Sequence, residues 1–146
     1  MDGLRILLVD GHAAVRQSLR MVLEEHPEWR VVAEASDGRE AVRQTEETVP
    51  DVVLMDVALP LLNGIEATRQ IVRRVPTAKV VILSTHVDEA YVALILEAGA
   101  VGYLLKYCAD TELVPAVMAV ASGQVFLSLS IPRSVPPDRG GAMPRG

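Results

Sequence analysis

The chain has 146 residues, a formal net charge of −5 at pH 7, and 50% hydrophobic against 23% charged residues. This length fits one ordinary domain, and the hydrophobic share excludes a disordered chain. The acidic balance and an aromatic content of only 3% argue against a nucleic-acid surface, which needs dense Lys and Arg or stacking rings.

The number of cysteines and the N-terminal sequence indicate the cellular compartment. The single cysteine, Cys108, excludes an internal disulfide and a Cys-rich zinc site, and it favours a reducing, cytoplasmic setting. The N-terminal stretch MDGLR is followed by only a short apolar run, so we expect no signal peptide and no transmembrane span.

Short apolar runs recur at regular intervals and predict strands. Runs of this length, made of β-branched residues and leucine and bounded by polar residues, are typical of strands buried on both faces. They are ILLV (6–9), RVVAEA (30–35), VVLM (52–55), VVIL (80–83) and GYLL (102–105).

Helical periodicity fills the intervals between these runs. Val15, Leu19, Val22 and Leu23 fall on one helical face, and the segment from Tyr91 to Ala98 ends at a capping glycine. Five rounds of strand and helix with right-handed crossovers predict an α/β fold, a single (βα)5 doubly wound parallel sheet of five strands. From about Gln124 the pattern fails, which predicts a domain over residues 1–123 and a flexible linker or tail over 124–146.

Polar side chains follow four of the predicted strands. Asp10 follows the first, Asp56 the third, Ser84 and Thr85 the fourth, and Lys106 the fifth. Because ligands bind beyond the carboxyl ends of parallel strands, we expect these groups to converge. Two carboxylates can hold Mg²⁺, one can accept a phosphoryl group, and an ammonium can neutralise phosphoryl oxygens.

Each of these residues also has an ordinary structural interpretation. An aspartate at a strand end is more often a turn or helix cap, a hydroxyl there usually bonds backbone, and Lys106 can simply be a solvated strand end. Only the joint placement favours a site. His12 and His86 also lie near strand ends, but without further partners we interpret them as surface or capping residues.

Three segments together resemble the receiver domain of two-component response regulators: DVVLMDVALPLLNGIEA, VVILSTH and GAVGYLLK. The resemblance covers residues 4 to about 122 and implies a flavodoxin-like fold. It implies that Asp56 is the phosphoacceptor of a sensor histidine kinase, with Pro60 and Gly64 in the loop that follows. It further implies that Lys106 senses the phosphate, that Ser84 and Tyr103 switch together, and that the Ala58 carbonyl joins the Mg²⁺ ligands.

The segments HAAVRQSLRMVLE, GYLLK and ASGQVFLS resemble the NarL/LuxR type of regulator, in which a helix-turn-helix domain follows the receiver. The chain shows no such domain, so DNA binding and transcription regulation are implied for longer relatives and not for this chain itself. Tyr107 stands where many receivers have proline. It places an aromatic ring on the face of the fourth helix, fifth strand and last helix, through which receivers commonly dimerise.

Gly11 departs from the family, which carries two adjacent acids at the end of the first strand. Because glycine has no carboxylate, Gly11 predicts weakened Mg²⁺ binding, and two hypotheses stay open. One is a phosphoaspartate switch that turns over no external substrate; the other is a degenerate receiver that serves as a phosphate-independent interaction module. A haloacid-dehalogenase-type phosphatase is a minor alternative because His12 stands where its second aspartate belongs, and a nucleotide-binding module lacks a glycine-rich loop.

Overall fold

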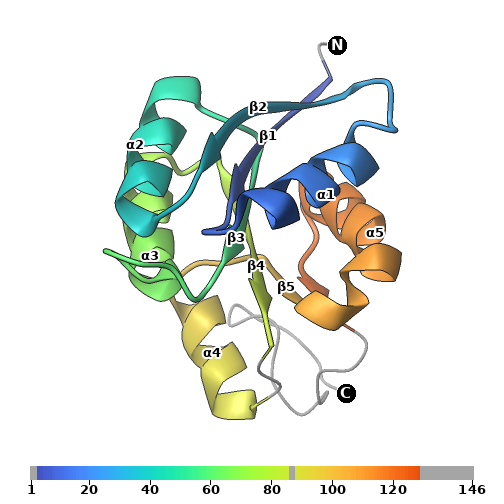
Figure 1. Ribbon diagram of the computed structural model, residues 1–146. Helices are drawn as coiled ribbons and strands as arrows, with labels where there is room; N and C mark the ends of the chain where they lie inside the picture. Colours follow the sequence, from blue (N-terminus) through green and yellow to red (C-terminus); the bar gives the residue numbers. More distant parts are fainter. Residues whose placement is uncertain (1–2, 86–87, 129–146) are drawn as a thin grey trace.

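The computed structural model describes residues 3–85 and 88–128, in which strands and helices alternate (Figure 1). The strands are β1 (Leu4–Val9), β2 (Trp29–Ala35), β3 (Val52–Asp56), β4 (Lys79–Ser84), β5 (Gly102–Leu105) and β6 (Phe126–Leu127). The helices are α1 (Ala13–Leu23), α2 (Gly38–Thr48), α3 (Gly64–Arg74), α4 (Glu89–Glu97) and α5 (Ala109–Ala121), and a 3₁₀ turn, η1 (Lys106–Cys108), joins β5 to α5.

The strands form one parallel sheet in the order β2-β1-β3-β4-β5-β6. Helices α1 and α5 cover one face, and α2, α3 and α4 cover the other (Figure 1). The chain order reverses between β1 and β3, so the crevice beyond these two strand ends is where an open α/β sheet places its ligands. The predicted doubly wound α/β fold class is confirmed.

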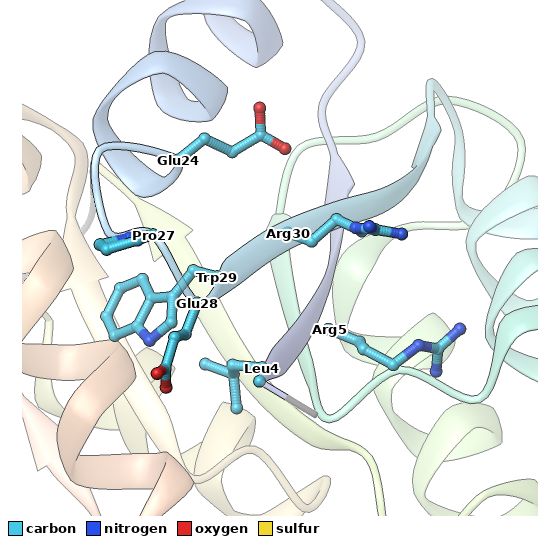
Figure 2. Close-up of a pocket in the computed structure, with 8 residues that line it drawn as sticks. Leu4, Arg5, Glu24, Pro27, Glu28, Trp29 and Arg30 are labelled. Carbon is cyan, nitrogen blue, oxygen red and sulfur yellow. The ribbon is translucent and has the colours of Figure 1, made fainter. Parts of the chain in front are cut away.

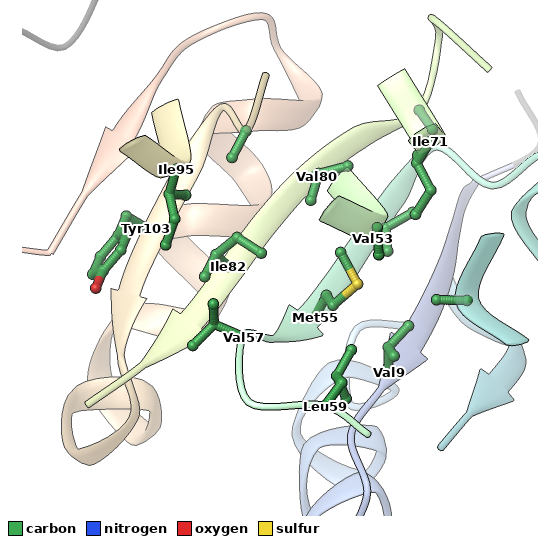
Figure 3. Close-up of a cluster of buried hydrophobic side chains, with 14 of the residues drawn as sticks. Val9, Val53, Met55, Val57, Leu59, Ile71, Val80, Ile82, Ile95 and Tyr103 are labelled. Atoms are coloured by element: carbon green, nitrogen blue, oxygen red, sulfur yellow. The ribbon is translucent and has the colours of Figure 1, made fainter. Parts of the chain in front are cut away.

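Alternate residues of each strand enter two separate cores. Val53 and Met55 of β3 pack toward α3 (Figure 3), while Val52 and Leu54 pack into the cluster under α1 and α5. All four side chains are fully buried. Burial on both faces explains why these strands read as continuous apolar runs rather than as an alternating pattern.

The strand number is the one correction to the predicted sheet, which has six strands where five were expected. Phe126 and Leu127 pair in parallel with Gly102 and Tyr103, inside the segment predicted as linker. Two residues are too few to show any periodicity, so no sequence pattern predicts this strand. The division of the chain at residue 123 stays a prediction, and residues 129–146 of the predicted tail, like His86, lie outside the described residues.

Ser128 extends the contact of β6 with the sheet. Its amide donates to the carbonyl of Tyr103 at 2.9 Å, and its hydroxyl donates to the Glu112 carboxylate of α5. Ser128 and Glu112 are both buried, so this pair fastens β6 to β5 and α5 together. Across the described ranges, no helix has the length and apolarity needed to cross a membrane.

Candidate functional site

Asp10, Asp56 and Lys106 meet at the carboxyl edge of the sheet, as their positions predicted. The ammonium Nζ of Lys106 lies 3.3 Å from Oδ2 of Asp56 and 3.6 Å from Oδ2 of Asp10. The aspartate side chains are only 2% and 6% exposed, whereas that of Lys106 is 31% exposed. Two buried carboxylates therefore share one cation that solvent can reach, an arrangement whose charges balance only in part.

One oxygen of the Asp10 carboxylate accepts hydrogen bonds, and the other faces the Lys106 ammonium. Its Oδ1 accepts the His12 amide at 2.9 Å and lies 3.2 Å from Nδ1 of the same residue. Its Oδ2 is buried and makes no hydrogen bond within the described part of the chain. The His12 side chain is 76% exposed, consistent with its interpretation as a surface residue, yet it touches the site.

The loop after β3 orients Asp56. The Ala58 amide donates to Oδ1 of Asp56 at 3.2 Å, which leaves Oδ2 facing Lys106. The loop closes tightly at Gly64, whose amide donates to the Val57 carbonyl at 2.9 Å. A Cβ on Gly64 would lie 2.7 Å from Cα of Val57, so the close approach of two backbone segments requires glycine here.

Ser84 and Tyr103 lie beside this cluster on adjacent strands. Ser84 is buried at the end of β4, and Tyr103 of β5 is fully buried, packed near Ile82 and Ile95 (Figure 3). Burial raises the pKa of the Tyr103 phenol, and a side-chain hydrogen bond with Ser84 acts in the opposite direction. Thr85, by contrast, is exposed.

The position of Gly11 has room for a side chain. A Cβ built there would meet only the carbonyl oxygen of Ser36, at 3.7 Å, an ordinary van der Waals distance. The φ of Gly11 also lies outside the left-handed region that glycine alone tolerates well. Neither sterics nor backbone conformation therefore explains the glycine, which leaves the missing carboxylate as its main consequence.

The donor set fits a divalent cation with few protein ligands. Asp10 and Asp56 supply hard oxygens, and the unbonded, buried Oδ2 of Asp10 is the kind of atom that a cation satisfies. In the described residues, His, Cys, Asp and Glu side chains nowhere gather in a group of three or more that could hold a metal ion. A bound Mg²⁺ would thus depend on two carboxylates, a backbone carbonyl and water.

Tyr107 lies in η1 with 66% of its surface exposed. Leu94 of α4 and Met118 of α5 are also exposed, on the helices that flank β5. The outer edge of β5 is itself paired with β6, so a homodimer through this face would use side chains of the two helices rather than the strand edge. That homodimer stays a prediction.

Sequence reasoning missed one contact of the site. Arg16, on the first turns of α1, donates from Nη1 to the carbonyl oxygen of Asp10 at 2.6 Å, and from Nε to the Glu34 carboxylate of β2 at 2.8 Å. The available signal is a long cationic side chain in the first turn of the helix, six residues after the strand-end acid. Its partner is a backbone atom, which no residue pattern identifies.

A hollow of about 550 Å³ lies at the other end of the sheet, where β1 and β2 begin. Glu24, Trp29 and Arg30 are among its lining residues (Figure 2). The Glu24 carboxylate already accepts the Val31 amide at 3.0 Å, and Arg5 donates to the Val49 carbonyl at 2.7 Å. Glu24 and Arg5 thus bond the local backbone, and the hollow lies far from the strand ends that carry Asp10, Asp56 and Lys106.

Comparison with known proteins agrees with this geometry. Residues 6–118 match the response regulator receiver domain family. The chain is 43% identical over 126 residues to the transcriptional regulatory protein DegU of Brevibacillus brevis, covering 86% of this chain and 53% of that protein. It is 41% identical over 128 residues to LiaR of Bacillus subtilis (strain 168), covering 88% of this chain and 61% of that protein.

Solved structures give the same answer. A LuxR-family two-component response regulator from Aurantimonas sp. SI85-9A1 has a TM-score of 0.84 and 43% identity, covering 88% of this chain and 92% of that one. The receiver domain of the putative response regulator NarL from Mycobacterium tuberculosis has a TM-score of 0.79 and 32% identity, covering 85% and 100%.

The chain therefore belongs to the response regulator receiver domain family. Within that family it is of the LuxR/NarL type, as its relatives and structural neighbours are. It spans between half and two thirds of the length of the curated relatives just described. Membership of this family argues against the two minor hypotheses, a haloacid-dehalogenase-type phosphatase and a nucleotide-binding module.

Proposed function

We propose that this receiver is a phosphoaspartate switch in which Asp56 accepts a phosphoryl group from a sensor histidine kinase. The observation that carries the proposal is the buried Asp10–Asp56 pair bridged by Lys106, next to Ser84 and Tyr103. A phosphoryl acceptor needs an oriented nucleophile and nearby positive charge, and this cluster has both.

The chain's own groups orient the acceptor. The Ala58 amide and Lys106 contact different oxygens of Asp56, which fixes the rotation of the carboxylate and leaves Oδ2 beside the ammonium. When Oδ2 attacks phosphorus, the bond to the donor nitrogen breaks and an acyl phosphate forms. Lys106 then neutralises part of the charge on the phosphoryl oxygens; Asp10 and Asp56 would hold Mg²⁺, which would supply further positive charge.

Ser84 and Tyr103 are the elements that would read the new group. The Ser84 hydroxyl lies at the end of the strand beside β3 and has one proton to donate, so a bond donated to a phosphoryl oxygen on Asp56 would compete with one donated to Tyr103. A switch requires such competing contacts, because a ligand shifts an equilibrium only by its different affinity for two states. No turnover of an external substrate is part of this proposal.

In its wider setting, we infer that the chain is the regulatory part of a LuxR/NarL-type transcriptional regulator. The relatives DegU and LiaR carry the description transcriptional regulatory protein, and this chain matches only part of their length. The proposed partners of the chain are the kinase, Mg²⁺ and, at the α4–β5–α5 face, a second copy of the chain. DNA would be bound by a separate domain.

Gly11 favours a second candidate function, a degenerate receiver that binds its partners without phosphate. The position offers no carboxylate, and exposed Tyr107 provides an aromatic contact beside the site. The intact Asp56, Ser84 and Lys106 argue for the switch instead.

Intact mass spectrometry after incubation with acetyl phosphate, with and without Mg²⁺, separates the two functions. The switch predicts a Mg²⁺-dependent gain of one phosphoryl group that is lost in Asp56→Asn. No gain at high Mg²⁺ from the folded protein would leave only the phosphate-independent function, in which the contribution of Tyr107 to partner binding becomes the next quantity to measure.

A further inference from the structure

We propose that Arg16 is a positioning residue that fixes Asp10, the single acid of the β1–α1 loop, in the orientation that the site requires. The proposal deepens the switch function and rests on it in assigning Asp10 a role in cation binding. Its structural part, the hold of Arg16 on Asp10, stands on hydrogen bonds alone.

One guanidinium joins three elements. Nη1 of Arg16 donates to the Asp10 carbonyl at 2.6 Å, and Nε donates to Oε1 of Glu34 at 2.8 Å. The other oxygen of Glu34 accepts from Nη1 of Arg20 at 2.5 Å. The side chains of Arg16 and Glu34 are only 18% and 28% exposed, so solvent competes little for these bonds.

The side chains of Arg16, Glu34 and Arg20 are all charged at neutral pH. The hydrogen bond from Arg16 lowers the pKa of the Glu34 carboxyl below its usual value, which keeps Glu34 ionised. Glu34 in turn lies on β2, the neighbour of β1 in the sheet. Arg16 is therefore braced against a rigid strand while it holds the Asp10 carbonyl.

The brace matters because the residue after Asp10 is a glycine. The Asp10 amide donates to the Ala35 carbonyl at 3.0 Å, which ties the strand side of the residue to β2. Its carbonyl side leads into Gly11, whose backbone is the least restricted of any residue type. Arg16 supplies the anchor on that side, and without it the peptide between Asp10 and Gly11 can rotate.

The geometry calls for arginine rather than lysine. The two donors in use, Nη1 and Nε, belong to one planar fork and reach a backbone carbonyl and a carboxylate at once. A lysine ammonium is a compact point charge on a flexible stem and does not reproduce that fork. Arg16→Lys therefore tests geometry separately from charge.

Hydrogen exchange of the His12 amide tests the hold without any ion or phosphate. That amide donates to Oδ1 of Asp10, so it reports whether the carboxylate keeps its place. We expect about tenfold faster exchange in Arg16→Gln, the loss of roughly one hydrogen bond. Arg20→Gln is the matched control, because Arg20 also binds Glu34 but does not contact Asp10. Amides of Leu8 and Leu54 in the central strands monitor global stability.

Mg²⁺ titration of the same proteins, followed by the NMR shifts of the His12 and Ala58 amides, tests the consequence. Removing a partner that orients a metal ligand typically costs at least tenfold in affinity, so we expect that loss in Arg16→Gln and in Arg16→Lys but not in Arg20→Gln.

Equal exchange of the His12 amide in the wild type and Arg16→Gln would overturn the proposal, as would full Mg²⁺ affinity in Arg16→Lys. If Asp56 gains no phosphoryl group while the His12 amide responds as expected, the switch function fails and the positioning role stands.

Discussion

Restoring a carboxylate at position 11 is the most direct way to measure what the glycine costs. In Gly11→Asp the new Cβ meets only the Ser36 carbonyl at 3.7 Å, so a Cβ fits at this position without backbone movement. The carboxylate would follow Asp10 directly in the chain and offer a third acidic oxygen donor to a cation. We expect Mg²⁺ affinity to rise roughly 10–100-fold, by the same amount that loss of metal-site partners usually costs.

The gain in Mg²⁺ affinity is accompanied by repulsion among the carboxylates when no Mg²⁺ is bound. A 10–100-fold rise in affinity corresponds to about 1.4–2.8 kcal/mol. Without Mg²⁺, however, a third carboxylate near Asp10 and Asp56 adds repulsion of about 1–3 kcal/mol at an effective dielectric of about 20, of which Lys106 screens a part. The variant should therefore be less stable than the wild type without Mg²⁺ and recover when Mg²⁺ is added.

Two measurements check this expectation. Mg²⁺ titration gives the affinity, and urea unfolding with and without Mg²⁺ gives the stability change. Gly11→Asn is the matched control, since it has nearly the same shape without the charge. A folded Gly11→Asp protein that binds Mg²⁺ no more tightly than Gly11→Asn would refute the reasoning that the glycine marks a missing ligand.

Two further changes test the loop after β3 and the switch tyrosine. Gly64→Ala places a Cβ 2.7 Å from the Val57 backbone, so we expect a loss of about 1–3 kcal/mol in urea unfolding and slower phosphorylation of Asp56. Because burial raises the pKa of Tyr103, folding favours its protonated form, and that contribution is complete below the ordinary tyrosine pKa of about 10 and is lost as pH rises above it. Unfolding free energies measured from pH 8 to 11 should fall more steeply in the wild type than in Tyr103→Phe; equal slopes would contradict this.

The sequence predicted the parts of the site that depend on topology. Asp10, Asp56 and Lys106 converge because each follows a strand, and parallel strands end at one edge whatever lies between them. The same logic placed Ser84 on that edge. These predictions required only the strand positions, which long apolar runs define well.

The parts that the sequence could not predict depend on single contacts. The bond from Arg16 to the Asp10 carbonyl joins a flexible side chain to a main-chain atom, and neither partner is marked by a pattern. Strand β6 has two residues, a single period of strand alternation, which is too short to be recognised as a pattern. It is held in addition by the bond between Ser128 and Glu112, two residues 16 positions apart in the sequence.

Strand β6 links its own backbone mechanically to the backbone of β5. Main-chain hydrogen bonds hold this part of the chain beside β5, among them the Phe126 amide to the Val101 carbonyl at 3.0 Å, just before β5, and the Ser128 amide to the Tyr103 carbonyl at 2.9 Å. Main-chain bonds do not depend on side-chain identity, except that proline has no N–H to donate. A displacement of the backbone at Tyr103 would thus be transmitted to β6 and Ser128 by the peptide groups themselves, while the side chains of Phe126 and Leu127 add packing against the two cores.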